Sequence, residues 1–200
     1  MKKDYIVAVV DSPDKMRLSH VARINNYAWS GSYRPRARGR LMYVPGDGFY
    51  ARLTAYEKDP RAVYFNNMDP VYRDSCLEFF ATYREGFGYI NCEVNANGAI
   101  LSAYGFNREE RTPLSEICGK FPEVSVSRYP DRWTAVVRVG NEILRAVYGD
   151  CDFGPGSVIR GNFYKCGDDC VEAHYGAFSP MESVTPNFHL PEQFAVMRLV

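Results

Sequence analysis

The sequence predicts an all-β protein: an antiparallel β-sandwich of about nine or more strands with a few short helices. Three observations predict this class. Apolar and polar residues alternate in short segments, turn residues separate these segments, and 15 Tyr and 12 Phe supply the rings that strands favour. No internal repeat interrupts the pattern, so we expect residues 1–200 to form a single domain with its own core.

The strands follow from this alternation, taken in chain order. The first is expected at residues 5–10. The next two, at residues 40–44 and 49–57, flank Pro45-Gly46-Asp47-Gly48, whose glycines allow the positive φ of a hairpin turn. The others are expected at residues 74–82, 89–95, 99–106, 123–128, 133–139, 157–164 and 194–199. Short helices are expected at residues 113–120 and 141–148, with one or two helical turns at 12–20.

Strand parity separates core residues from a polar face. In residues 89–95 every second side chain is apolar, so Asn91 and Glu93 lie together on the opposite face. The same argument puts Trp133 in the core. A polar face of this kind has two explanations. It can hold a sugar, whose hydroxyl groups both donate and accept hydrogen bonds, or it can simply be the side of a sheet that water covers.

Charge and hydropathy exclude several classes of partner. The 24 Lys and Arg balance the 24 Asp and Glu, so there is no basic field to attract nucleic acid or an anionic membrane surface. The apolar run at residues 6–10 is too short for the hydrophobic part of a secretory signal, so we expect a cytoplasmic protein. In that compartment the six cysteines are expected to be free thiols.

Several ordered motifs resemble the family 9 carbohydrate-binding modules, most closely their stand-alone, family 9-like branch. The motifs are RLMYVPGDGFYARLTAYE at residues 40–57, DPVYRDSCLEFF at 69–80, YINCEVNANG at 89–98, GNFYKC at 161–166, HYGAFSP at 174–180 and PNFHLP at 186–191. The resemblance implies a β-sandwich that binds carbohydrate, at an oligosaccharide or polysaccharide end, without catalysis. It also implies an association with glycan-processing enzymes, and bound calcium in some members.

The candidate ligand-binding residues combine strand parity with this resemblance. They are Arg52, Glu78, Asn91, Glu93, Arg108, Asn162, Lys165 and His174. Lys165 has inward parity, but it stands at a strand end, from which its side chain can reach a loop pocket. The sugar-binding modules of this family hold the ligand between two tryptophans. This chain has only Trp29 and Trp133, so Tyr33, Tyr72, Tyr104 and Tyr175 are alternative aromatic partners.

Two metal sites can be considered from the sequence. Cys166, Cys170 and His174, with Cys151, have the ligand types of a zinc site, although free thiols explain them more simply. Calcium would need several converging oxygen ligands, for which Asp150-Cys-Asp152 and Asp168-Asp169 are the candidates. Acidic pairs of this kind are common in surface turns, so we assign no metal-binding residue.

Two other functions compete with non-catalytic binding. The first is a carbohydrate-active enzyme that pairs Glu78 or Glu93 with Lys165 or His174, since glycoside hydrolysis uses two carboxyl groups. The second is a protein-interaction or haem-binding domain on the same sandwich. No catalytic motif of the common hydrolase or nucleotide-binding classes is present, so we expect no enzyme.

Overall fold

The computed structural model describes residues 3–149 and 152–200. Its strands are β1 (Asp4–Val9), β2 (Ala22–Ile24), β3 (Arg36–Val44), β4 (Gly48–Tyr56), β5 (Cys76–Thr82), β6 (Tyr89–Asn95), β7 (Ile100–Gly105), β8 (Arg111–Pro113), β9 (Glu123–Tyr129), β10 (Arg132–Gly140), β11 (Val158–Gly167), β12 (His174–Ala177) and β13 (Ala195–Leu199). The helices are α1 (Leu114–Cys118) and α2 (Asn141–Tyr148), with short 3-10 helices at Pro13–Leu18, Val71–Arg73 and Pro191–Gln193. Within the described residues, no helix has the length and apolar character needed to cross a membrane.

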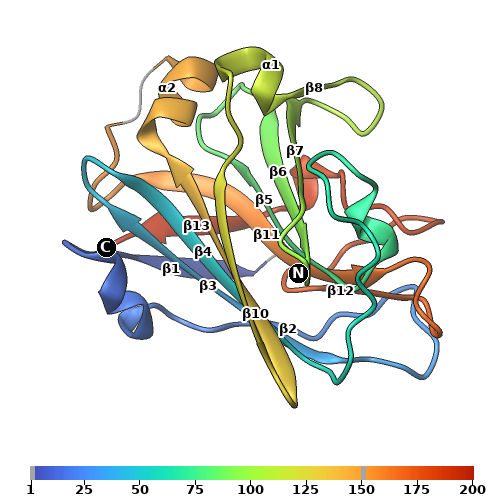
Figure 1. Ribbon diagram of the computed structural model, residues 1–200. Coiled ribbons are helices and arrows are strands. Elements are labelled where there is room, and N and C mark those ends of the chain that lie inside the picture. Colours follow the sequence, from blue (N-terminus) through green and yellow to red (C-terminus); the bar gives the residue numbers. More distant parts are fainter. Residues whose placement is uncertain (1–2, 150–151) are drawn as a thin grey trace.

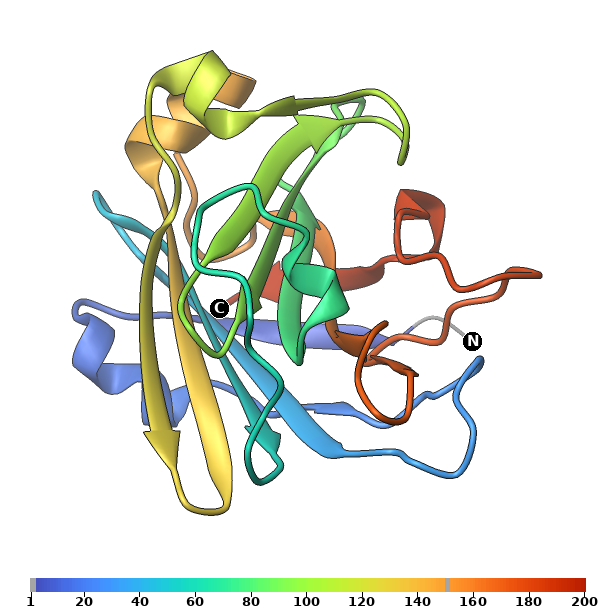
Figure 2. The same ribbon diagram turned by 45° about the vertical axis from the view of Figure 1, so that its right-hand side comes forward.

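The strands form one curled path of hydrogen-bonded neighbours. Their order is β8-β7-β6-β5-β11-β13-β1-β3-β4-β10-β9, with β12 beside β11 and β2 beside β3. This path folds over into two facing layers, one containing β5, β6 and β11 and the other β3, β4 and β10 (Figures 1 and 2). The predicted all-β sandwich is therefore confirmed.

Strand β1 joins the two layers. Its residues Asp4 to Val7 pair with β13, and Ala8 and Val9 pair with β3. Both pairings are parallel, whereas the other described strand pairs are antiparallel. The antiparallel expectation therefore fails at β1, because this strand meets its neighbours through long connections rather than hairpins.

The main core lies between the two layers and is rich in aromatic rings. Trp133 is fully buried in it, as its parity predicts. Phe163 on β11 packs against Phe79 on β5, with ring centroids 4.9 Å apart. A Cβ atom on Gly39 of β3 would lie 2.3 Å from the Phe163 ring, so only glycine lets the two layers approach this closely here.

A second apolar cluster covers part of the outer face of the β5–β11 layer. Residues from the C-terminal segment fold back onto it, and Phe188 stacks on Tyr164 with centroids 4.1 Å apart. Asn162 is fully buried beneath the same segment and exchanges hydrogen bonds with the backbone of Ser179. Glu78, Asn91 and Glu93 of the same layer are also buried, so contact with water does not explain these polar residues. They must find partners among themselves or in a ligand.

Candidate functional site

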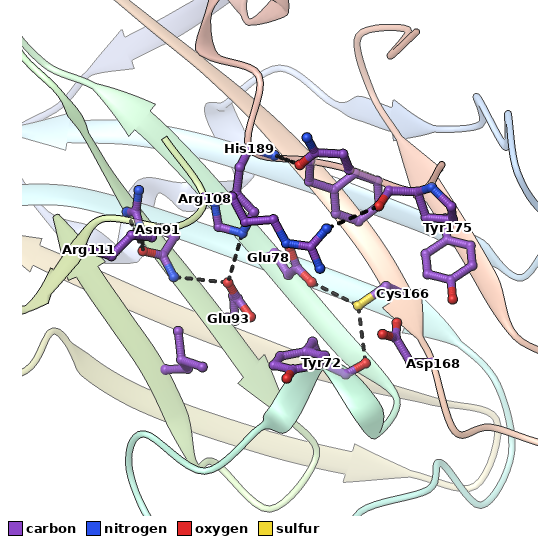
Figure 3. A pocket seen from close by; sticks show the side chains of 14 residues that line it. Tyr72, Glu78, Asn91, Glu93, Arg108, Arg111, Cys166, Asp168, Tyr175 and His189 are labelled. Carbon is purple, nitrogen blue, oxygen red and sulfur yellow. Dashed lines mark hydrogen bonds and ion pairs between the residues drawn. The ribbon is translucent and has the colours of Figure 1, made fainter. Parts of the chain in front are cut away.

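A pocket of about 460 Å³ opens on the outer face of the β5–β6–β11 layer (Figure 3). Strands form its floor, and loops between β7 and β8 and before the C-terminal 3-10 helix form its sides. Its lining residues are Tyr72, Glu78, Asn91, Glu93, Leu101, Arg108, Arg111, Cys166, Asp168, Tyr175, Pro186, Asn187, Phe188 and His189. The volume is in the range of small-molecule sites.

Two carboxyl groups lie side by side on the pocket floor. Glu78 on β5 is directly opposite Glu93 on β6, and both residues are buried. Burial and the neighbouring Glu93 raise the pKa of Glu78 well above its ordinary value. Burial also raises the pKa of Glu93 to about 7, although Asn91 and Arg111 oppose the rise. The pair therefore holds at least one proton near neutral pH and can both donate and accept hydrogen bonds.

Asn91 positions Glu93, and Arg111 in turn positions Asn91. The Asn91 Nδ2 atom donates to Glu93 Oε1 at 2.9 Å. Arg111 donates to Asn91 Oδ1 from Nε and Nη2, at 3.1 and 2.5 Å, and its Nη2 atom also reaches the backbone carbonyl of Ala103 at 2.8 Å. Because the Arg111 guanidinium is committed to these acceptors, we assign it a positioning role.

His189 and Arg108 complete the polar lining on the loop side. The Tyr89 hydroxyl lies 2.7 Å from His189 Nδ1, and His189 Nε2 lies 4.0 Å from Glu93 Oε1. Burial, Arg111 and Arg108 lower the pKa of His189 to about 3, so its ring is neutral near pH 7. Arg108 is exposed, and its Nη1 atom donates a long, 3.5 Å hydrogen bond to the Pro186 carbonyl. Its guanidinium is therefore free to meet a ligand.

Aromatic side chains contribute walls to the pocket, but tryptophan does not. Of the four alternative tyrosines, Tyr72 and Tyr175 line it. Tyr33 instead packs against His174, and Tyr104 packs against Tyr148. Trp29 lies behind the wall.

The indole of Trp29 supports the wall from outside the pocket. Its ring is 6.0 Å from that of Phe188, and its Nε1 atom donates to the Ser183 carbonyl. The structure therefore has no two-tryptophan clamp, and tyrosine rings take the positions next to the polar floor.

Strand parity and the resemblance together gave eight candidate residues, and the structure brings four of them to this pocket. Glu78, Asn91, Glu93 and Arg108 line it. The other four do not join them. Arg52 lies on β4 in the opposite layer and is exposed, because outward parity does not say which of the two sheets a strand belongs to. Asn162 is covered by the Ser179 backbone, as described above.

Lys165 and His174 form a separate buried cluster with Glu57. The Lys165 ammonium lies 2.7 Å from His174 Nε2 and 3.5 Å from Glu57 Oε1, and Lys165 is fully buried. Glu57 also accepts hydrogen bonds from Trp133 Nε1 and the Ser75 hydroxyl. The inward parity of Lys165 thus decides its position: the side chain stays buried and does not line this pocket, although its place at a strand end allowed it to reach a loop pocket.

This cluster has the electrostatics of a structural ion pair. Burial alone would raise the pKa of Glu57, and Lys165, Ser75 and Trp133 together hold it below its ordinary value. Burial and the neighbouring Lys165 lower the pKa of His174 to about 4, so this imidazole is neutral and accepts from the ammonium. The enzyme hypothesis that pairs Glu78 or Glu93 with Lys165 or His174 therefore lacks its basic partner in the pocket.

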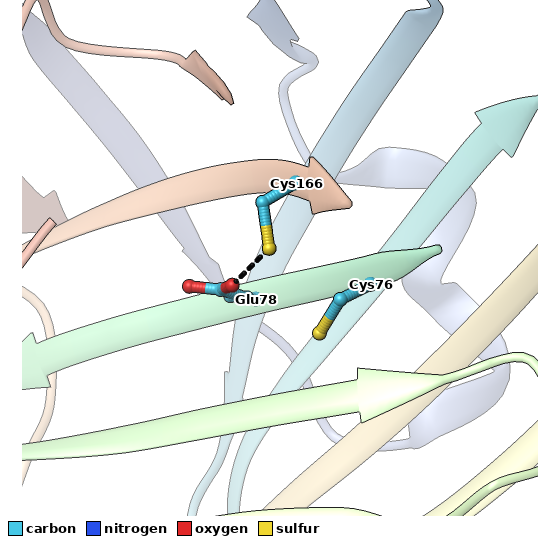
Figure 4. A group of neighbouring side chains, drawn as sticks. All are labelled: Cys76, Glu78 and Cys166. Carbon is cyan, nitrogen blue, oxygen red and sulfur yellow. Dashed lines mark hydrogen bonds between the residues drawn. The ribbon is translucent and has the colours of Figure 1, made fainter. Parts of the chain in front are cut away.

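One group of described residues has the spacing of metal ligands. Donor atoms of Cys76, Glu78 and Cys166 all lie within 4.8 Å of one another, and Cys166 donates to Glu78 Oε1 at 2.8 Å (Figure 4). Two thiols and one carboxyl group suit a soft cation and do not fit calcium, which needs six or more oxygen ligands. This group contains neither Cys170 nor His174.

The other acidic candidates for calcium do not converge. Asp168 lines the pocket, whereas Asp169 lies 3.9 Å from the Arg61 guanidinium. Asp150 and Cys151 lie outside the described residues. Within residues 3–149 and 152–200, the one group of three or more potential metal-ligand side chains whose donor atoms lie within 4.8 Å of one another is Cys76, Glu78 and Cys166.

Sequence reasoning missed several pocket residues. Arg111 stands on the three-residue strand β8, and His189 lies in a loop outside the predicted strands. The sequence feature that could have indicated His189 is the PNFHLP segment at residues 186–191. This segment is one of the motifs that resemble the family, but it shows no alternation of apolar and polar residues.

Comparison with known proteins defines the class as a carbohydrate-binding β-sandwich. The family model described as carbohydrate-binding family 9 matches residues 9–199. The chain therefore belongs to carbohydrate-binding family 9, whose function is non-catalytic carbohydrate binding. A search of curated proteins gives no match.

Solved structures show the same fold at low sequence identity. A candidate carbohydrate-binding protein from Bacteroides uniformis has 23% identity and a TM-score of 0.85, with 100% of both chains covered. A family 9 module from Caldicellulosiruptor kristjanssonii in complex with cellotriose has 13% identity and a TM-score of 0.67, covering 98% of this chain and 93% of that one. The corresponding structure with glucose has 12% identity and a TM-score of 0.69, covering 99% and 96%.

Proposed function

We propose that the pocket on the β5–β6–β11 layer is the carbohydrate-binding site and that it holds the terminal unit of a neutral oligosaccharide. The observation that carries this proposal is that two buried carboxyl groups, those of Glu78 and Glu93, stand directly opposite each other at the pocket floor. Adjacent sugar hydroxyls need partners that both donate and accept, and a partly protonated carboxyl pair supplies both within one small area.

The rest of the lining supports the same ligand. Arg108 adds a cationic donor, neutral His189 adds an imidazole, and Tyr72 and Tyr175 offer rings on which the C–H face of a sugar can stack. A volume of about 460 Å³ suits one or two sugar units rather than a long chain lying across the sheet. Glucose and cellotriose, which are bound in the two Caldicellulosiruptor structures, are therefore the first ligands to test.

The arrangement favours binding over hydrolysis. Glycosidases place their two carboxyl groups on either side of the scissile bond, with one of them ionised. Here Glu78 and Glu93 project from adjacent strands of the same floor, and burial keeps the pKa of both raised. We therefore propose that the protein binds carbohydrate and does not cleave it.

The test is calorimetric titration of the intact protein with a glycan panel that includes glucose and cellotriose. Arg108→Ala should weaken binding about tenfold or more, because it removes a charge-assisted hydrogen bond. Arg160→Ala is the matched control, since Arg160 is an exposed arginine on β11 outside the pocket lining. Tyr72→Ala should also weaken binding, whereas Tyr129→Ala, at an exposed tyrosine outside the lining, should not.

Two results would overturn the proposal. The first is a sugar that binds with the same affinity to the wild type and to both pocket variants, which would put the site elsewhere. The second is release of shorter products from a bound oligosaccharide, detected by chromatography and abolished by Glu78→Gln, which would make the protein an enzyme.

A further inference from the structure

An arginine pattern in β3 has no role in the pocket. The segment Arg34-Pro-Arg-Ala-Arg-Gly-Arg40 places arginine at every second position. In the strand this period puts Arg36, Arg38 and Arg40 on one face. The alternate residues Ala37 and Gly39 are buried between the layers, so packing forces the arginines outward.

The strand register brings further arginines to the same face. Arg38 on β3 is directly opposite Arg23 on β2, and Arg40 is directly opposite Arg52 on β4. Figure 1 shows β2, β3 and β4 side by side in the layer that does not carry the pocket. Like charges directly opposite each other on adjacent strands destabilise a sheet. Both pairs therefore place positive charge on this face without stabilising the sheet, and the Arg23–Arg38 pair lines a groove.

These side chains form a groove of about 600 Å³. Its charged lining residues are Arg23, Arg34, Arg36 and Arg38, and no carboxylate lines it. Within residues 3–149 and 152–200, no ion pair joins any of these four guanidinium groups to an acid. By contrast, Arg138 on the neighbouring strand β10 pairs with three acids. Positive charge is therefore uncompensated in the groove.

One aromatic ring orients part of this charge. The Arg36 guanidinium lies 3.6 Å from the centroid of the Tyr56 ring, and that of Arg38 lies 5.4 Å from it. A guanidinium held over a ring keeps its N–H edges available for a planar anion. Arg40 is different, because its Nη1 atom donates to the carbonyls of Arg17 and Ser19, so we leave it out of the ligand set.

We propose that this groove is a second binding site, for a carbohydrate chain that carries carboxylate or sulfate groups. Arginine binds such groups through paired hydrogen bonds. The chain as a whole has zero net charge and so lacks the extended basic field of nucleic-acid-binding proteins. The inference rests on the proposed function only in taking the ligand to be a carbohydrate, since the groove and the pocket lie on different layers.

The test uses the intact protein and four polymers: polygalacturonate, dextran sulfate, neutral dextran and single-stranded DNA. Binding is measured by affinity electrophoresis and calorimetry. The double variant Arg36→Gln with Arg38→Gln should bind the anionic polysaccharide at least about tenfold more weakly. The matched control is Arg160→Gln with Arg198→Gln, which removes two exposed arginines from the other layer. Melting temperatures of both double variants check that they fold, and Arg23→Gln alone provides a milder groove variant.

The outcomes separate this proposal from the proposed function. If only the groove variant loses affinity for an anionic polysaccharide, the result supports a second binding site in the groove. The polymer whose binding is weakened then shows whether the groove prefers carboxylate or sulfate. Arg108→Ala should leave polyanion binding unchanged, and the groove variant should leave glucose binding unchanged. Three results would overturn the proposal of a second site. The control double variant could lose as much affinity for the anionic polysaccharide as the groove variant does. The wild-type protein could bind neither anionic polysaccharide, or it could bind single-stranded DNA more tightly than polygalacturonate and dextran sulfate.

Discussion

The carboxyl pair in the pocket makes a quantitative prediction for Glu93→Gln. Glutamine has nearly the shape of a protonated glutamate, and its oxygen can still accept the Asn91 Nδ2 hydrogen bond. The substitution therefore keeps the floor of the pocket but removes the negative charge that Glu93 gains as pH rises. It also removes from Glu78 the like charge on the opposite strand.

The sign and size of the stability change in Glu93→Gln follow from the pKa of Glu93. Folding raises this pKa from 4.5 to about 7, and the side chain is only 5% exposed. The stability that Glu93 contributes as a protonated acid is fully present below pH 4.5 and is lost as pH rises through 7. The loss is about 3 kcal/mol between the two limits. Glu93→Gln should therefore be more stable than the wild type at about pH 8, by a similar amount, and equal to it at the acidic limit.

Two histidines have the opposite effect, so the comparison must be made between variants. The pKa of His174 falls from 6.5 to about 4 and that of His189 to about 3, so their contributions to stability rise with pH through this range. Both residues remain in Glu93→Gln. The difference between the two unfolding curves therefore isolates the pocket carboxyl group.

The assay is urea unfolding of both proteins at several values from about pH 5 to about pH 8, read by tryptophan fluorescence. Glu116→Gln, at an exposed glutamate on α1, is the matched control and should follow the wild type. Parallel curves for the wild type and Glu93→Gln across the whole range would refute the claim that Glu93 is protonated by burial.

Other substitutions test the packing of the sandwich. Gly39→Ala should lower the free energy of unfolding, measured by the same urea assay, by about 1–3 kcal/mol, because the new Cβ atom would lie 2.3 Å from the Phe163 ring. Gly31→Ala is the control and should leave the free energy of unfolding nearly unchanged, because a Cβ atom at Gly31 would have no heavy atom within 4 Å apart from its chain neighbours. Glu57→Gln should lower it by about 3 kcal/mol or more, because it leaves the buried Lys165 ammonium without its counter-charge. A stability within error of the wild type for Glu57→Gln would refute the claim that the buried Lys165–Glu57 ion pair stabilises the fold.

The sequence predicts those strands best whose side chains alternate. Residues 89–95 form β6 with the predicted bounds, and Ile90, Cys92 and Val94 lie in the core as parity requires. The strands that were missed are short or charged. Strands β2, β8 and β12 have three or four residues, too few for a period to show. The first four residues of β3 are part of the arginine run, and their polarity hid a regular alternation.

Parity located the pocket floor but could not locate the pocket. It placed Glu78, Asn91 and Glu93 on one face because they stand on neighbouring strands. Parity also selected Arg52, because each strand of a sandwich has one side facing outward. Alternation does not show which of the two layers the strand belongs to. Residues that reach the site from loops, such as His189, have no period at all.

The enclosure of the pocket depends on the apolar cluster that the same strands support. Phe188 stacks on Tyr164 of β11, and this contact fixes the loop that carries His189. Tyr164 stands two residues before Cys166 on the same face, directly opposite Glu78. The outer face of the layer therefore changes from apolar to polar within one strand, and the C-terminal segment that buries the apolar part also forms the pocket wall. Because that wall is held by ring packing rather than by the ligand, the site is largely preorganised, which lowers the entropy lost on binding.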